Sequence, residues 1–321
     1  MLSPAARLSV VAARLRHFTV ELGQGAWMRS VHDRIGRREL LLGGILGVAA
    51  MGAAGVESRV LPGRDSLPQW LGGVPPGVPD VQAGPLATGS FVSTRRGGAR
   101  VGWSIAYPPG VRRAGLPVLV VLHGRGSTHA HAFGANLHLD RFLAQAVSRG
   151  APPFAIAAAD GGDHEYWHPR RGTDPAGMIT DEFLPLLAER GLDVRRVGLL
   201  GWSMGGYGAL YLAGALGAAR VAVVVAESPA IWHHSYQSVA GAFDDAGDFD
   251  RHAIFGHQRS LAGIALRIDC GAGDGFAPVT RDLRASLRPT PAGGIEPGAH
   301  NAVYWRGQAP AQLAFVGAHL R

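Results

Sequence analysis

The sequence predicts an α/β fold, with a mostly parallel central sheet carrying helices on both faces in a three-layer sandwich. The chain has 321 residues, 47% apolar and 17% charged, which is enough to bury a large core and excludes a disordered chain. Five short runs are apolar at almost every position, as in parallel strands covered on both faces. Helical segments separate several of these runs, which is the alternation of a doubly wound domain.

These elements follow one another from about residue 87. Residues 90–96 and 100–109 flank Gly97 and Gly98 and predict an opening hairpin. The five apolar strands are expected at residues 117–124, 154–160, 196–202, 221–228 and 266–271. Helices are expected at residues 138–149, 174–190 and 203–218, and a weak strand at 293–297 precedes a last helix. In such a sheet, functional residues gather at the carboxyl ends of the strands.

Residues 1–56 are expected to be an export leader. Arg37 and Arg38 precede an uncharged stretch rich in Gly and Ala, residues 40–56, which is similar to a twin-arginine export signal. An uncleaved membrane anchor and a buried helix are the alternatives, and Met28 is an alternative start of the chain. We therefore expect an exported protein, in the cell envelope or secreted, and anchored in the membrane where the leader is not cleaved.

The remaining chain divides into a Gly- and Pro-rich linker, residues 57–86, and one domain, residues 87–321. Seven Arg against three acidic residues place +4 of the formal net charge of +7 in residues 1–56, so the charge does not indicate a nucleic-acid partner. The single cysteine, Cys270, excludes an intrachain disulfide.

Ser203 is the first candidate functional residue. Residues 201–205, Gly-Trp-Ser-Met-Gly, fit G-x-S-x-G between a predicted strand and a predicted helix, which is the context that a nucleophilic serine requires. At so sharp a turn, the positions two before and two after the serine cannot carry bulk. The alternative is a Gly-rich turn in which Ser203 only caps the helix.

A nucleophilic serine needs a histidine base and a carboxylate that orients it, in the chain order Ser, Asp, His. Asp274 follows the last strong strand and His300 precedes the last helix, so we expect a Ser203–Asp274–His300 triad. Asp269 is expected to be structural, Glu227 is a poorer candidate carboxylate, and a surface loop is the alternative for His300.

The oxyanion hole and the substrate contacts are expected close to this triad. The N–H of Met204 and an N–H in the loop after residues 117–124 would form the hole, with Arg125 preferred over Gly124 or Gly126. Gly124 and Trp232 are the expected substrate contacts, with packing as the alternative for Trp232.

Residues 231–255 are polar and poorly periodic, so they are expected either to cap the site or to be a solvated surface. No metal site is expected, because the histidines of residues 123–168 lack the spacing of a known ligand set.

Together these residues resemble the putative-esterase branch of the α/β-hydrolase superfamily, which includes esterase D and antigen 85. The resemblance covers about residues 88–320 and is specific in GWSMGGYGAL, DCGAGDGF and GAHNAVYW. It is closest to exported actinobacterial members. The resemblance implies the α/β-hydrolase fold, the same triad, and the backbone N–H groups of Arg125 and Met204 as the oxyanion hole.

We therefore expect an exported serine esterase that needs no cofactor and acts on a small-molecule or lipid ester. An antigen 85-like acyltransferase and a noncatalytic cell-envelope binding protein are the two alternatives. Hydrolysis and acyl transfer would use one site and differ in the acceptor of the acyl group.

Overall fold

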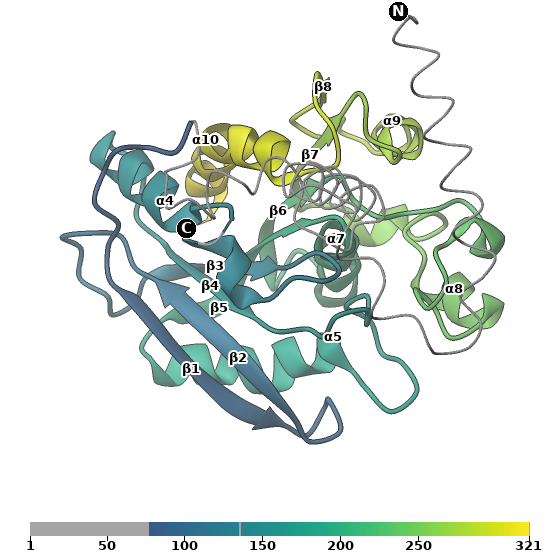
Figure 1. Ribbon diagram of the computed structural model, residues 1–321, viewed down its shortest axis with the longest axis horizontal. Helices are drawn as coiled ribbons and strands as arrows, with labels where there is room; N and C mark the ends of the chain where they lie inside the picture. Colours follow the sequence, from purple (N-terminus) through teal and green to yellow (C-terminus); the bar gives the residue numbers. More distant parts are fainter. Residues whose placement is uncertain (1–76, 135, 321) are drawn as a thin grey trace, which may run out of the picture. The chain divides into compact units, whose positions relative to one another are not determined.

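The computed structural model describes residues 77–320 apart from residue 135, so the expected leader and most of the expected linker lie outside the described residues. An eight-stranded sheet runs through this part of the chain in the order β1-β2-β4-β3-β5-β6-β7-β8 (Figure 1). β1 pairs with β2 and β2 with β4 in antiparallel fashion, whereas the pairs from β4 through β3 to β8 are parallel. The predicted mostly parallel sheet is confirmed.

The strands lie close to their predicted positions, except that the first begins at Leu86, the last residue of the expected linker and four residues before the predicted strand. They are β1 (Leu86–Ser93), β2 (Ala99–Ala106), β3 (Pro117–Leu122), β4 (Ala155–Ala159), β5 (Asp193–Trp202), β6 (Val221–Glu227), β7 (Ala265–Gly271) and β8 (Ile295–Glu296). Every residue of β4 and β6 is buried, which explains why these strands are apolar at every position except Glu227. The predicted opening hairpin is β1 and β2, whose register ends at the pair Ser93 and Ala99.

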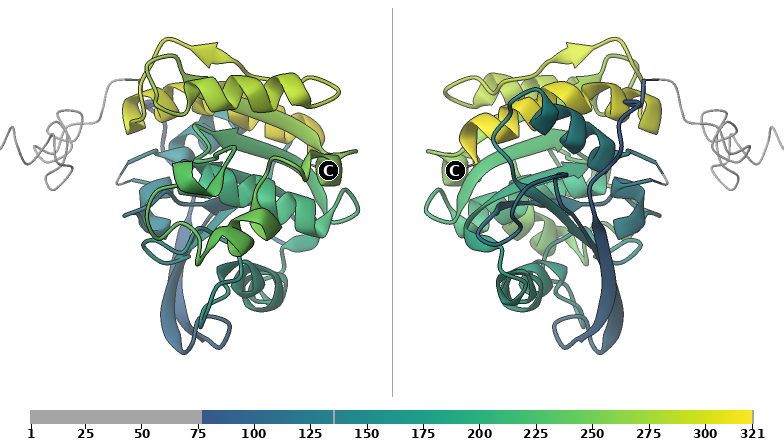
Figure 2. Two further views of the ribbon diagram at one scale, coloured as in Figure 1. Left: turned by 90° about the vertical axis from the view of Figure 1, so that its right-hand side faces the viewer. Right: turned by 90° about the vertical axis from the view of Figure 1, so that its left-hand side faces the viewer.

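Helices cover both faces of the sheet (Figure 2). They are α4 (Leu139–Ser148), α5 (Pro175–Met178), α6 (Leu184–Glu189), α7 (Met204–Leu216), α8 (Ala246–His252), α9 (Ala277–Ser286) and α10 (Ala302–His319). Along β3, Leu119 and Val121 belong to the apolar core that includes α4 and α10, whereas Val118 and Val120 belong to the core of α5, α6 and α7. Among the described helices, none is both long and apolar enough to cross a membrane.

The helix predicted over residues 174–190 is interrupted. Between α5 and α6, residues Ile179–Phe183 form one wider, π-helical turn. Glu182 in this turn accepts hydrogen bonds from the N–H groups of Thr94 (2.8 Å) and Arg95 (3.1 Å) at the tip of the opening hairpin. The interruption thus accompanies a contact between two segments 87 and 88 residues apart in the chain, which periodicity does not reveal.

Candidate active site

Ser203 lies at the turn between β5 and α7, with backbone angles φ +56° and ψ −119°. These angles are disfavoured for a residue with a side chain, so the surrounding structure must impose them. The Ser203 N–H donates to the Glu227 carbonyl at 2.9 Å, and its own carbonyl accepts from the Ala230 N–H at 3.0 Å. Both partners belong to β6 and the residues after it, which therefore fix the turn.

The glycines around Ser203 are required by close backbone contacts. A Cβ on Gly201 would lie 2.1 Å from the Gly205 carbonyl oxygen, and a Cβ on Gly205 would lie 1.9 Å from the carbonyl oxygen of Leu122. A Cβ on Gly206 would lie 2.9 Å from the Glu227 carbonyl oxygen. The predicted reason for the glycines is confirmed, since side chains here would collide with backbone atoms.

The structure brings the three expected triad residues into one hydrogen-bonded line. His300 Nε2 lies 2.9 Å from Ser203 Oγ, and His300 Nδ1 lies 2.7 Å from Asp274 Oδ2. The Gly273 N–H donates to the Gly298 carbonyl at 2.8 Å, so the loop after β7 lies beside the loop before α10. The side chains therefore meet although the histidine and the serine are 97 positions apart.

Asp274 is held as a carboxylate. It is only 5% exposed, and burial alone would raise its pKa. The hydrogen bonds from His300 and from the Phe276 N–H, which lies 2.9 Å from Oδ1, outweigh this effect and lower the pKa of Asp274 below its ordinary value. The ionised carboxylate accepts the Nδ1–H of His300, which leaves the Nε2 lone pair facing the serine hydroxyl.

Two backbone segments carry the N–H groups that are expected to form the oxyanion hole. Met204 is the first residue of α7, so its N–H has no partner within the helix. Arg125 lies in the loop that leaves β3, three residues after the strand ends, and it is exposed. The positive end of the α7 dipole adds to the attraction for an anion beside Ser203.

His123 stabilises the loop that contains Arg125 through two hydrogen bonds. Its Nδ1–H donates to the Gly124 carbonyl at 2.8 Å, and its Nε2 accepts the Gly161 N–H at 2.9 Å. Burial lowers the pKa of His123 to about 4, so the ring is neutral and both contacts are satisfied. Gly124 is close to the ring of Trp202, since a Cβ there would lie 2.8 Å from the indole nitrogen.

Comparison with known proteins places this chain in a family. Residues 95–287 match the esterase family, described as "Putative esterase". The chain belongs to the esterase family. It is a carboxylic-ester hydrolase, and the resemblance inferred from its motifs is confirmed. No curated protein sequence matches the chain.

Three solved structures of similar fold are distant in sequence from this chain. A ferulic acid esterase is 18% identical, with a TM-score of 0.63 over 73% of this chain and 98% of its own. An S-formylglutathione hydrolase from Agrobacterium tumefaciens is 15% identical, with a TM-score of 0.63 over 76% of this chain and 98% of its own. The fluorophosphonate-binding serine hydrolase F of Staphylococcus aureus is 17% identical, with a TM-score of 0.59 over 74% of this chain and all of its own. These similarities identify the α/β-hydrolase fold.

Aromatic side chains of the esterase form a wall that begins at His300. The Phe276 ring lies 5.4 Å from the His300 ring, and the Trp232 ring lies 5.7 Å from Phe276. Trp232 also contacts Tyr166 at 5.9 Å and Phe243 at 6.3 Å between ring centroids. Trp232 is half-buried, so it packs within this wall and still presents part of its surface.

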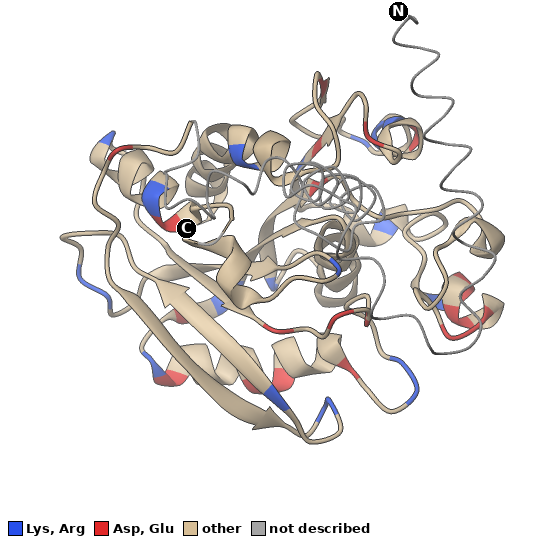
Figure 3. Ribbon diagram, in the orientation of Figure 1, with Lys and Arg blue, Asp and Glu red and all other residues tan. Residues whose placement is uncertain are grey.

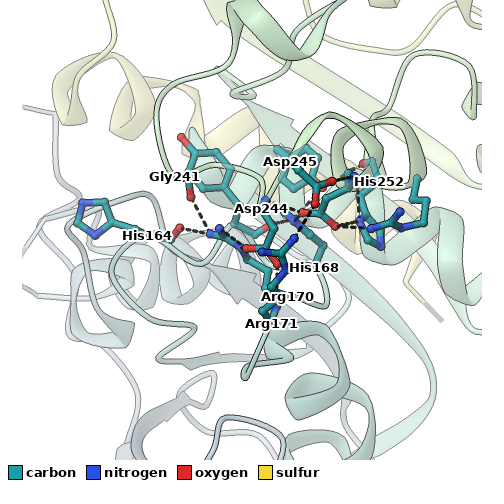
Figure 4. Close-up of polar contacts among 12 residues, drawn as sticks. His164, His168, Arg170, Arg171, Gly241, Asp244, Asp245 and His252 are labelled. Carbon is teal, nitrogen blue, oxygen red and sulfur yellow. Dashed lines mark hydrogen bonds and ion pairs between the residues drawn. The ribbon is translucent and has the colours of Figure 1, made fainter.

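The cap segment, residues 231–255, is tied to the loop after β4. Arg170 donates to Asp244 Oδ1 at 2.8 and 3.2 Å and to the Gly241 carbonyl at 2.6 Å, and the Arg171 N–H donates to Asp244 Oδ2 at 2.8 Å (Figure 4). Acidic residues gather on α8 and just before it (Figure 3). Residues 231–255 are therefore anchored to the loop after β4 by charged hydrogen bonds.

One group in the described part of the esterase has the composition of a metal site. His168, Asp248 and His252 place one ligand atom each within 4.8 Å of one another. However, Asp248 Oδ2 accepts the Asp244 N–H at 2.9 Å, His252 Nδ1 lies 2.9 Å from Asp248 Oδ1, and the two imidazole rings stack with centroids 4.8 Å apart. These groups could hold a cation only by giving up those hydrogen bonds, so their present geometry is that of an anchor between the cap segment and its neighbouring loop.

Two residues beside the triad were not predicted as part of the site. Ser228 follows β6, and Trp305 lies in the first turn of α10. The signal in the sequence was the Ser-Pro pair directly after a strand that is apolar up to Glu227, at the carboxyl edge of the sheet. Periodicity alone assigns Trp305 to the core face of a helix.

Proposed function

We propose that this esterase hydrolyses carboxylic esters through an acyl-enzyme, with Ser203 as nucleophile, His300 as general base and acid, and Asp274 as the carboxylate that orients His300. The observation that carries the proposal is the unbroken line of two hydrogen bonds, 2.9 Å and 2.7 Å long, from Ser203 through His300 to Asp274. Nucleophile, base and orienting group in this order are what a serine hydrolase needs.

Acylation begins when His300 Nε2 takes the hydroxyl proton and Ser203 Oγ attacks the carbonyl carbon of the ester. The oxygen that becomes negative is stabilised by the N–H groups of Met204 and Arg125. The imidazolium then protonates the leaving alcohol, and the acyl group stays on Ser203 as an ester. Water attacks this ester with His300 again as base, which releases the carboxylic acid and restores the serine. The reaction uses no cofactor.

The substrate is proposed to be a small-molecule or lipid ester. The solved relatives named above act on different esters, so they do not identify the acyl group. Acyl transfer to a sugar or lipid hydroxyl would use the same acyl-enzyme with a different acceptor. A product assay with water alone and with added trehalose distinguishes the two, because transfer would yield an acylated sugar.

The esterase is further proposed to be exported through its first 56 residues. Arg37 and Arg38 before the uncharged stretch support this proposal. Replacing both arginines by lysine in the full chain should retain the protein in the cytoplasm, as measured by fractionation and immunoblotting. Equal export of the variant would contradict a twin-arginine route.

The catalytic proposal is tested with the full chain, the Ser203→Ala variant and a Ser148→Ala control. Hydrolysis of p-nitrophenyl esters should fall by at least about 10³-fold in Ser203→Ala, because the nucleophile is lost. The Ser148 control lies at the exposed end of α4 and should match the parent. A fluorophosphonate probe should label the parent and the control but not Ser203→Ala. Labelling of Ser203→Ala would exclude this serine as the nucleophile, and a parent that neither reacts nor turns over would favour the binding-protein alternative.

A further inference from the structure

Ser228 is a buried residue in a strained conformation beside the triad. It follows β6 directly, is fully buried, and has a positive φ of +45° although it is not glycine. Its N–H donates to the Asp269 carbonyl at 2.8 Å, which continues the pairing of β6 with β7. Such backbone strain persists only where neighbouring structure imposes it, and it concentrates at functional sites.

Trp305 connects Ser228 to the histidine of the triad. Its Nε1–H donates to Ser228 Oγ at 3.1 Å. Its ring lies 5.0 Å from the His300 ring at 85°, an edge-to-face contact. One side chain thus limits the rotation of His300 and also holds the Ser228 hydroxyl.

The hydrogen bonds open to the Ser228 hydroxyl follow from its single proton and from the donor that it already accepts. An indole N–H can only donate, so Ser228 Oγ accepts from Trp305 and keeps its own proton for another acceptor. Two acceptors lie beside it, the Asp274 carboxylate and the Cys270 sulfur. A thiol sulfur is the weaker acceptor, and the Cys270 thiol itself points its proton toward the Gly271 carbonyl. The Asp274 carboxylate is therefore the stronger acceptor for the Ser228 proton.

We propose that Ser228 and Trp305 are positioning residues that hold Asp274 and His300 in their working geometry. Trp305 donates to Ser228, the Trp305 ring packs against His300, and His300 bonds to Asp274. In this assignment the Ser228 hydroxyl donates to the Asp274 carboxylate and closes the ring of contacts. This inference rests on the proposed function, because it concerns how the proposed base is oriented.

The ring of contacts has a consequence for Asp274. Its Oδ2 accepts from His300 and its Oδ1 from the Phe276 N–H, and a further donor stabilises the charge of this buried carboxylate without taking the place of His300. Without Ser228, the carboxylate charge would be less dispersed and would hold the imidazolium more strongly. The base would then release its proton less readily to the leaving alcohol.

The experiment uses the full chain with Ser228→Ala, which removes the hydroxyl, and Trp305→Phe, which removes the N–H and keeps a ring beside His300. The matched controls are Ser104→Ala and Trp103→Phe in β2. Ser104 is equally buried and bonds only to His129 among the described hydrogen bonds, and the Trp103 N–H has no partner within the described residues. The readouts are kcat and KM for a p-nitrophenyl ester, the pH profile of kcat/KM, and the melting temperature.

We expect kcat of Ser228→Ala to fall about 10- to 100-fold with KM changed less than about twofold, the size of one lost hydrogen bond to a charged group. The acidic limb of the kcat/KM profile should move to higher pH, and Trp305→Phe should move it in the same direction. Both controls should keep the parental kcat and profile. Parental kcat and an unmoved limb in Ser228→Ala and Trp305→Phe would overturn the proposal, even where the melting temperature falls, because packing alone would then explain both residues.

Ser228→Gly separates the hydroxyl from the backbone strain. Glycine accepts a φ of +45° freely, so this variant should be more stable than Ser228→Ala and equally slow. Recovery of parental kcat in Ser228→Gly would show that only strain mattered and would overturn the proposal. Ser203→Ala in the same series tests the proposed function separately. If Ser203→Ala is as active as the parent, that function fails, whatever Ser228 does.

Discussion

Gly205 lies directly against Leu122, the last residue of β3, since a Cβ on Gly205 would come within 1.9 Å of the Leu122 carbonyl oxygen. This contact packs the first turn of α7 against the end of β3. Met204 begins that turn, and Arg125 lies in the loop that continues from β3. The spacing of the two proposed oxyanion donors therefore depends on a position that has no side chain.

Gly205→Ala should abolish or severely reduce ester hydrolysis, because the added methyl group must push α7 away from β3. We expect a destabilisation of at least about 2 kcal/mol from overpacking against backbone atoms. Gly307→Ala is the matched control, because a Cβ there meets nothing within 4 Å and the residue lies on α10. It should stabilise the protein by about 0.5–1 kcal/mol. Urea unfolding and ester hydrolysis test both, and a Gly205→Ala protein with parental activity would contradict the close approach.

Much of the fold and the meeting of three site residues could be predicted from the sequence, because the relevant signals are local. β6 is buried on both faces, so its run of apolar residues predicts a parallel strand. Ser203, Asp274 and His300 each follow or precede a recognisable element, and the carboxyl edge of a parallel sheet collects such positions.

The contacts that could not be predicted from the sequence join residues that are distant in the chain. Glu182 bonds to a hairpin tip almost 90 positions away, and Arg170 bonds to Asp244 across 74 positions. The role of Ser228 depends on Trp305, 77 positions later. No periodic pattern encodes such pairs, because each depends on how two loops meet after the sheet has formed.

Arg170→Met should loosen the cap segment far more than Arg171→Met. The side chains of Arg170 and Asp244 are 13% and 18% exposed, whereas the Arg171 side chain is 78% exposed. Removing Arg170 leaves a largely buried carboxylate without its ion partner, which should cost about 2–3 kcal/mol. Removing the Arg171 side chain breaks only an exposed pair with Asp245 and should cost less than about 1 kcal/mol.

Urea unfolding measures these two costs, and limited proteolysis shows whether cleavage in residues 231–255 speeds up in Arg170→Met. Because the same segment carries Trp232, the KM for p-nitrophenyl esters should also rise in Arg170→Met. Equal stability of the two variants would show that the Arg170 contacts do not hold the cap segment.

The free energy of unfolding should fall as the pH drops from about 6.5 to about 4. Burial lowers the pKa of His123 to about 4 from an ordinary value of 6.5, so the unfolded chain binds a proton in this range that the folded protein refuses. The contribution is on the order of 3 kcal/mol across the range. Asp274 has the opposite sign of charge and a lowered pKa, so its stabilising contribution is lost only below its ordinary value of 3.8.

His123→Asn should make this dependence shallower, because asparagine does not titrate. Urea unfolding of the parent and the variant between about pH 7 and pH 4.5 measures the two slopes. The variant should be less stable at neutral pH, since it loses the acceptor of the Gly161 N–H, and the difference should shrink as the pH falls. Parallel curves for the two proteins would contradict a buried neutral His123.

The backbone of Ser203 is strained. Its φ of +56° with ψ of −119° suits glycine and disfavours every residue with a Cβ. Ser203→Gly and Ser203→Ala should both be inactive, yet Ser203→Gly should be the more stable by about 1 kcal/mol, because relief of strain exceeds the greater entropy of glycine in the unfolded chain.

At an ordinary helical position, alanine should be more stabilising than glycine. Ala146→Gly within α4 should lower the free energy of unfolding by about 0.5–1 kcal/mol. Comparing the two sites by urea unfolding isolates the backbone term, since each comparison exchanges the same methyl group for hydrogen. If Ser203→Gly is less stable than Ser203→Ala, the turn is not strained. If it is more stable, the protein gives up stability to hold its proposed nucleophile above the sheet, as expected where function requires a backbone conformation that folding alone would avoid.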